Sequence, residues 1–250
     1  MRKDGVTFSI ARHAQWAPGL TTPEAWAQWA RSPQPITPGE EPAVKAMPPM
    51  LRRRAGLFGK MALEVAYECL DGRNDVPTVF CSRHGEVSRA LELLSDLARG
   101  EPLSPTAFSM SVHNANVGLL TIARKDRANH IALAAGGATI EHAVIDACSL
   151  LEDGVPMVLL VACDAPLPEL FVPFLDCAEQ AYAWAWLITK VEADSNLPVL
   201  SLRWSASGAA PSSDLPGGLA VAQFFLSGAD SMARSDGRLR WCWSREAASV

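Results

Sequence analysis

The chain has 250 residues, of which 49% are hydrophobic and 20% charged, an ordinary globular composition with enough length for one large domain or two small ones. Its formal net charge of -5 argues against broad electrostatic capture of nucleic acid. No apolar run reaches the roughly 18 residues needed to span a bilayer, and the N-terminus leads into a β-like segment rather than a secretory signal, which together predict a cytoplasmic protein with no membrane span.

The cysteines and histidines give no sign of a metal or a disulfide framework. No two cysteines form a CxxC pair, and most lie inside apolar runs, which is typical of reduced, buried thiols. They are Cys69, Cys81, Cys148, Cys163, Cys177 and Cys242. No set of His, Cys, Asp and Glu has the spacing of a zinc site, so we expect neither a metal nor a cofactor.

The first half of the chain alternates strand and helix patterns. Residues 6–12 predict a strand, and a proline-rich segment at 17–50 contains one short helix, 23–31. Residues 51–70 predict an amphipathic helix, because their apolar residues recur at helical spacing. A buried-type strand at 77–83 and a helix at 86–98 follow.

The second half continues the alternation. We expect, in chain order, a loop with a short helix, a strand, a helix, two strands, and a tail of strand, helix and strand. These elements are 102–125, 130–135, 138–152, 156–163, 181–192, 199–204, 217–227 and 238–243. The alternation predicts an α/β fold built on a mainly parallel sheet with helices on both faces.

The turn between strand 130–135 and helix 138–152 contains Gly136-Gly137 and has three interpretations. A helix N-terminus binds anions, but AAGGAT matches neither GxGxxG nor GxxxxGK[ST]. A plain structural turn and an active site without its nucleophile both remain open. Cys163, at the end of a strand, and Cys148, on the helix, are alternative nucleophiles, although buried core positions explain both.

Three segments resemble the N-terminal half of the β-ketoacyl synthases of the thiolase fold. They are RRAGLFGKMALEVAYECL, VFCSRHGEVSRALELLSDLARGEPLSPTAFSMSVHNANVG and GATIEHAVIDACSLLEDGVPMVLLVACDAPLPE. The amino-acid sequence of these segments is most similar to that of the small, chain-length-factor-like subunits of bacterial type II systems for aryl polyene pigments. The resemblance covers about residues 5–192 and implies a thiolase-like domain over 1–192, with an abbreviated segment at 193–250 packing on it.

The resemblance also implies that the catalytic groups are missing. Synthases carry a cysteine at the N-terminus of the helix after this turn, where the helix dipole favours thiolate, and that position falls on Gly137. They also supply two histidines from their C-terminal half, whereas this chain has no histidine after His142. We therefore expect no catalysis by this chain alone.

In the family, the loop before the turn and the strand leading into it contact a partner subunit. The matching interface residues are Phe108, Met110, His113, Asn114 and Ala132. The implied partners are a full-length β-ketoacyl synthase and, through the complex, an acyl carrier protein with its bound acyl chain. Because a carrier protein is acidic, Arg52, Arg53 and Arg54 are candidates to contact it.

The function that the resemblance implies is a non-catalytic subunit that pairs with a synthase in polyketide or fatty-acid-type biosynthesis and shapes its acyl tunnel. The alternative, from a different class, is a small free-standing acyltransferase or hydrolase using Cys163 or Cys148. That alternative requires a histidine within hydrogen-bond reach of the thiol.

Overall fold

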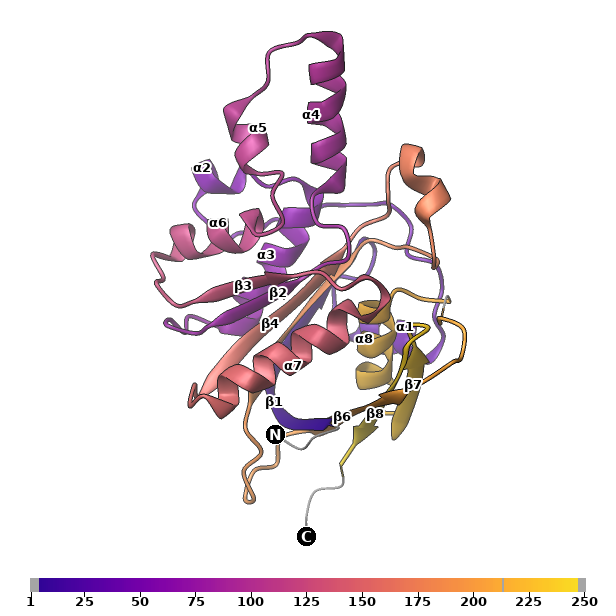
Figure 1. The fold of residues 1–250 in the computed structure, drawn as a ribbon. Coiled ribbons are helices and arrows are strands. Elements are labelled where there is room, and N and C mark those ends of the chain that lie inside the picture. The colour runs from indigo at the N-terminus through magenta and orange to yellow at the C-terminus, as the bar shows by residue number, and fades with distance from the viewer. Residues whose placement is uncertain (1–4, 213, 247–250) are drawn as a thin grey trace.

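An eight-stranded sheet runs through the described part of the protein, residues 5–212 and 214–246, in a computed structural model (Figure 1). The strand order is β3-β2-β4-β5-β1-β6-β8-β7. The strands are β1 (Gly5–Trp16), β2 (Thr78–Cys81), β3 (His130–Leu133), β4 (Met157–Asp164), β5 (Tyr182–Thr189), β6 (Val199–Ala206), β7 (Ser231–Ser235) and β8 (Leu239–Arg245).

The helices cover both faces of this sheet. They are α1 (Pro23–Arg31), α2 (Pro49–Arg52), α3 (Leu57–Leu70), α4 (Val87–Arg99), α5 (Pro105–Ser109), α6 (Ala115–Arg124), α7 (Thr139–Glu152) and α8 (Gly217–Ser227), with the 3-10 turns η1 (Gly136–Ala138) and η2 (Glu169–Phe174). Helices α7 and α8 lie on one face and α3 and α6 on the other, while α4 and α5 rise away from the body (Figure 1).

The sheet is less parallel than the sequence pattern predicts. Only two strand pairs of the described sheet are parallel, β2 with β3 on one side and β2 with β4 on the other. All other pairs, from β4–β5 to β7–β8, are antiparallel. The prediction of a mainly parallel sheet is therefore wrong. The reason is that the segment between β4 and β5 contains η2 but no crossover helix of the kind that a parallel return needs.

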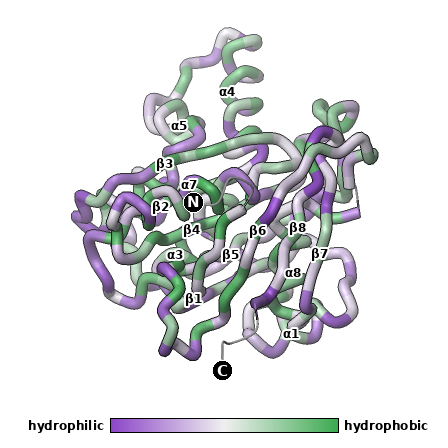
Figure 2. Tube along the Cα trace, turned by 60° about the horizontal axis from the view of Figure 1, so that its bottom comes forward, coloured by the Kyte–Doolittle hydropathy of each residue, from purple (hydrophilic) through white to green (hydrophobic). Residues whose placement is uncertain are grey.

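Strand β5 explains how the two hydrophobic layers meet. Along YAWAWLIT, Trp184 and Trp186 point into the layer under α7 and α8, and Ala183 and Ala185 point into the layer under α3. The side chains of a strand alternate between faces, so this strand is apolar along its whole length because both of its faces are buried. Figure 2 shows β4 and β5 running through the middle of the molecule.

Two local predictions differ from the structure. The helix predicted over 51–70 is divided into α2 and α3, because Gly56 has extended backbone angles (φ -77°, ψ -174°) and caps α3. Strand β7 was not predicted, since SMARS is short and polar and has no alternating apolar pattern.

The sheet continues across residue 192, because β1 pairs with β5 on one side and with β6 on the other.

Candidate functional site

The turn before α7 is held by its own backbone and by one side chain. Gly136 has a φ of 56°, in the left-handed region that favours glycine. Thr139 Oγ1 donates a hydrogen bond to the Gly136 carbonyl (2.8 Å) and accepts one from the Ala135 N–H (2.9 Å). The turn therefore keeps its shape without any bound ligand.

Gly137 differs from Gly136, because neither its backbone nor its surroundings require glycine. Its φ is not positive, and a Cβ built there meets no atom within 4 Å. A larger residue at position 137 would fit at the start of the helix. The missing side chain is therefore not a consequence of packing.

A buried ion pair lies directly behind Gly137. Arg234, on β7, contacts Glu141 Oε1 on α7 at 2.7 Å, and both side chains are almost fully buried. Both terminal nitrogens of Arg234 also donate to the Gly137 carbonyl, each at 3.2 Å. Trp243 Nε1 donates to the same Glu141 oxygen (3.3 Å). The C-terminal hairpin is thus tied to the N-terminus of α7.

Neither member of this pair was predicted from the sequence. Glu141 is fully buried, whereas its neighbour His142 is exposed and packs edge-on against Trp241. The sequence contains a pattern that could have placed Glu141 in the interior. Glu141, Val144 and Cys148 recur at helical spacing, which puts Glu141 on the apolar face of α7. Arg234 carries no comparable signal, since it lies 93 residues away in a strand that the pattern does not show.

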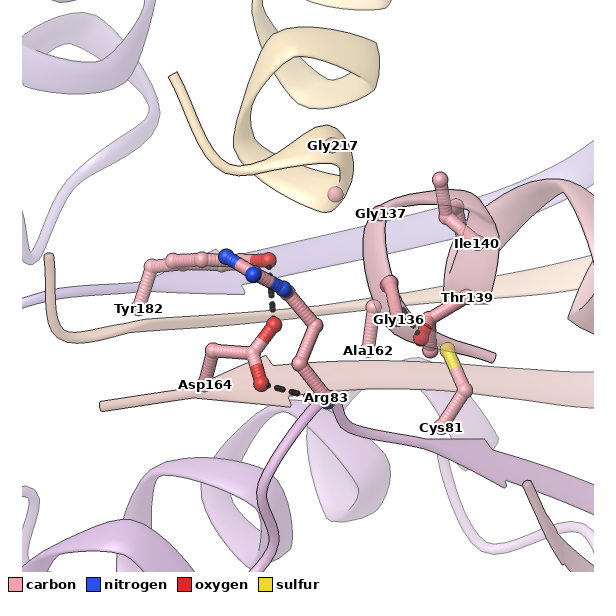
Figure 3. Close-up of a pocket in the computed structure, with 11 residues that line it drawn as sticks. Cys81, Arg83, Gly136, Gly137, Thr139, Ile140, Ala162, Asp164, Tyr182 and Gly217 are labelled. Atoms are coloured by element: carbon pink, nitrogen blue, oxygen red, sulfur yellow. Dashed lines mark hydrogen bonds between the residues drawn. The ribbon is translucent and has the colours of Figure 1, made fainter. Parts of the chain in front are cut away.

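A second polar cluster lies at the carboxyl ends of β2 and β4 (Figure 3). Asp164 accepts hydrogen bonds from Ser82 Oγ (2.9 Å), the Arg83 N–H (2.8 Å) and Tyr182 OH (2.9 Å). Complete burial raises the pKa of this carboxyl above its usual value, although these donors oppose the rise. Asp164 is therefore a buried structural acceptor.

Arg83 extends from the end of β2 towards the N-terminus of α8 (Figure 3). Its guanidinium pairs with Asp176 and contacts Cys177 Sγ (2.6 Å) and Glu179 (3.7 Å). Only 6% of the Arg83 side chain is exposed. The segment between β4 and β5 is held against the sheet by these contacts.

The space next to Gly137 is small. A cavity of about 10 Å³ lies between Gly137, Asp164 and Tyr182. A second, of about 100 Å³, lies between Gly137, Arg83 and Arg234. Both are well below the ~300–1,000 Å³ of typical small-molecule sites. A Cβ at Gly217 would lie 2.6 Å from Arg234, so the close approach of α8 depends on glycine there.

The two alternative cysteines lack the surroundings of a nucleophile. Cys163 is fully buried, its Sγ donates to the Phe58 carbonyl (3.4 Å), and burial raises its pKa well above the usual value. Burial, with Glu152 nearby, raises the pKa of Cys148 to about 12. Within residues 5–212 and 214–246, no histidine is hydrogen-bonded to either thiol. Both thiols are therefore protonated and inert at neutral pH.

The structure divides the predicted interface residues into two groups. Phe108 is 63% exposed on α5, and Asn114 is exposed at the start of α6. Met110 is buried in the layer under α3, so its side chain does not reach the surface at which a partner would bind. Its place at the end of α5 turns it inwards.

His113 and Ala132 also face the protein itself. His113 Nε2 donates to the Ser82 carbonyl (3.0 Å), and its ring packs against Phe80, so this residue fixes the loop to β2. Ala132 is half-buried on β3 against the same hydrophobic layer. Strand β3 itself stands at the edge of the sheet, paired on one side only by β2.

Other classes of site gain no support from the described residues. In the part of the chain with defined coordinates, no group of three or more His, Cys, Asp or Glu side chains is placed to hold a metal ion. None of the helices described is long and apolar enough to cross a membrane.

Comparison with solved structures gives full-length matches. One is a ketosynthase (ApeO) in complex with its chain length factor (ApeC) from Xenorhabdus doucetiae, with 29% identity, a TM-score of 0.84, and coverage of 96% of this chain and 100% of that chain. The AntDE:AntF complex, a type II PKS acyl-carrier protein in complex with its ketosynthase bound to the hexaketide, matches at 12% identity, with a TM-score of 0.69 and coverage of 96% and 99%.

A third match extends the likeness of fold. The ishigamide ketosynthase/chain length factor has 16% identity and a TM-score of 0.60, over 82% of this chain and 65% of that chain. No curated protein matches the chain.

The family model described as "Beta-ketoacyl synthase, N-terminal domain" matches residues 26–244. This match and the first structural match extend beyond residue 192, the predicted limit of the resemblance. The family match includes β7, the strand that carries Arg234. Because the family model spans most of the sequence, the chain belongs to the β-ketoacyl synthase family, in which it matches the N-terminal domain.

Proposed function

We propose that this chain is a non-catalytic, chain-length-factor-like subunit that pairs with a complete β-ketoacyl synthase in a type II system. The single observation that carries the proposal is the state of the turn before α7. Position 137 has no side chain although one would fit, and the carbonyl of that residue is bound by Arg234. A helix N-terminus in this state holds no nucleophile to take up an acyl group.

Two further observations support a dependent role. The sequence has no histidine after His142, so a second catalytic group is absent from the C-terminal part. The likeness at 29% identity covers the whole of one chain in a complex of a ketosynthase with its chain length factor. A chain of this size therefore has a counterpart in an assembly and not only in full-length enzymes.

The proposed role is to complete the partner synthase and to close the end of its acyl tunnel. The acyl chain would remain on the acyl carrier protein and on the synthase cysteine, and this subunit would form no thioester. The resemblance to aryl polyene subunits makes such a pathway the proposed setting. The proposed interface includes residues 104–118 and 129–135, of which Phe108 and Asn114 are the exposed predicted contacts.

The test is co-expression with a full-length synthase from an aryl polyene system, followed by sizing and a condensation assay with acyl carrier protein. We expect a defined complex that elongates acyl chains, and this chain alone to aggregate and to show no condensation. Exposed apolar side chains on α4, α5 and η2 supply the physical reason for aggregation.

Two outcomes would contradict the proposal. One is a stable, monodisperse monomer that does not bind the synthase. The other is stoichiometric acylation of Cys148 or Cys163 by an acyl thioester, which would favour the free-standing enzyme.

A further inference from the structure

Two segments leave the sheet at the same edge and carry apolar side chains into solvent. Strands β2 and β4 are parallel neighbours, so their carboxyl ends lie together. The chain that leads to α4 and α5 departs from the end of β2, and the chain with η2 departs from the end of β4. Both segments project from the same end of the molecule, and Figure 2 keeps α4 on that side (Figures 1 and 2).

These segments bury few of their own residues. Leu93 is the one buried residue of α4, and none is buried in α5 or η2. Leu94 and Leu97, neighbours on one side of α4, are 59% and 60% exposed, and Leu170 and Phe174 of η2 are 65% and 72% exposed. We call these four side chains, with Phe108, the carboxyl-edge surface. An apolar surface of this kind marks an interaction site.

The charges around the carboxyl-edge surface are mostly negative. Exposed or half-exposed acidic residues on α4, after α4 and on η2 are Glu92, Asp96, Glu101 and Glu169, while Asp176 after η2 is paired with Arg83. The basic residues of the two segments are fewer: Arg83 is buried and paired, Arg89 is half-buried beside Glu86, and Arg99 is exposed. A partner with an apolar centre and a basic rim therefore fits this surface.

This charge pattern separates the possible occupants. In a two-fold contact of the surface with itself, the same acidic residues would approach one another, which disfavours a second copy of this chain. An acyl carrier protein is acidic as well and would be repelled for the same reason.

We infer that the carboxyl-edge surface docks on a basic-rimmed apolar surface of the partner synthase, with α4 and η2 as two separate contact elements. This inference rests on the proposed function and adds to it two contact elements outside the predicted interface of residues 104–118 and 129–135. It also assigns the synthase, and not the carrier protein, to this face.

The experiment uses the full chain co-expressed with a tagged synthase. The variants are the pairs Leu94→Glu with Leu97→Glu and Leu170→Glu with Phe174→Glu, which change only exposed side chains. Val191→Glu is the matched control. Val191 is 44% exposed, and it follows β5 at the end of the sheet where Thr189 pairs with Met157, opposite to the carboxyl end of β4.

Each pair should raise the dissociation constant of the complex at least about 100-fold, because two apolar contacts are replaced by charges, and Val191→Glu should leave it unchanged. The pair Glu92→Lys with Glu169→Lys should weaken the complex, and less so at high salt.

The outcomes are separable. If the wild type binds the synthase and both apolar pairs bind equally well, the carboxyl-edge surface is not the interface, although the proposed function stands. If the pairs abolish self-association or carrier-protein binding and leave the synthase complex intact, the occupant is wrong. If the wild type itself does not bind the synthase, the proposed function and this inference both fail.

Discussion

At the residue scale, the buried ion pair between Arg234 and Glu141 is the feature of the turn that the sequence does not predict. The glycine at position 137 is visible in the sequence, because the helix that follows it is strongly patterned. The contact of the Arg234 guanidinium with Gly137 cannot be predicted from the sequence, since Arg234 belongs to a short polar strand 97 residues away from Gly137. Local patterns predict what stands at a turn, but the group packed behind it depends on tertiary structure.

The Arg234→Met variant should unfold more easily than the wild type. It leaves Glu141 fully buried without its charge partner, and such a loss costs about 3–5 kcal/mol. The double variant Glu141→Leu with Arg234→Met should recover most of the loss, because neither charge remains buried. Denaturant unfolding of the co-purified complex measures the stability lost in the single variant and the stability recovered in the double variant. Equal stability of Arg234→Met and wild type would show that the pair is unimportant.

The Gly137→Cys variant should react with iodoacetamide and still catalyse no condensation. The new thiol has room and stands at a helix N-terminus, where thiolate is favoured. Cys148 and Cys163 should remain unlabelled in the same sample, because burial raises the pKa of each thiol. Mass spectrometry of the alkylated protein locates the label. Condensation by the variant without a synthase would contradict the missing-histidine interpretation.

At the scale of elements, the periodicity of the sequence predicts most helices and strands, but it does not predict which of their side chains are exposed to solvent. The pattern of 86–98 predicts the helix α4, but it does not show that Leu94 and Leu97 remain in solvent. Likewise the segment 102–125 carries two apolar residues of the predicted interface, and the structure turns Met110 inwards while leaving Phe108 outside. Which side of an amphipathic segment is covered depends on elements far away in the chain.

Strand β3 should gain protection when the synthase binds. Its outer edge has no partner strand within the described chain, and backbone pairing across it would satisfy free amide groups. Hydrogen exchange over 129–135 should slow at least about tenfold in the complex, since pairing withdraws these amides from solvent. Strand β7, at the opposite edge, provides an internal control. Equal exchange over 129–135 in both states would exclude this edge from the interface.

The Ala132→Asp variant should break the complex, but Ala132 packs against the layer under α3, so the change also costs stability. Ile131→Asp, at a position 37% exposed on the same strand, separates the two effects. It should reduce binding to the synthase with less effect on unfolding. Loss of stability without loss of binding in both variants would assign β3 a role in folding alone.

At the scale of the whole molecule, the α/β architecture with helices on both faces was predictable, and the strand directions were not. Alternation of strand and helix patterns suggested parallel strands, but β1 is inserted between β5 and β6, far from its neighbours in sequence. The match of the family model to residues 26–244 and the continuous sheet both place the tail in the same fold as the rest. The division into 1–192 and 193–250 stays a prediction.

The contact between Arg234 and the Gly137 carbonyl also constrains how this protein can evolve. Glu141, Gly217 and Arg234 depend on one another, since a Cβ at position 217 would meet the guanidinium and loss of either charge would leave the other buried and unpaired. A substitution at any one of these three positions would leave a buried charge unpaired or create a clash, so we expect single changes there to cost stability, whereas position 137 accepts a side chain. We therefore expect Glu141, Gly217 and Arg234 to change together during evolution, while position 137 and the exposed surface vary independently of them.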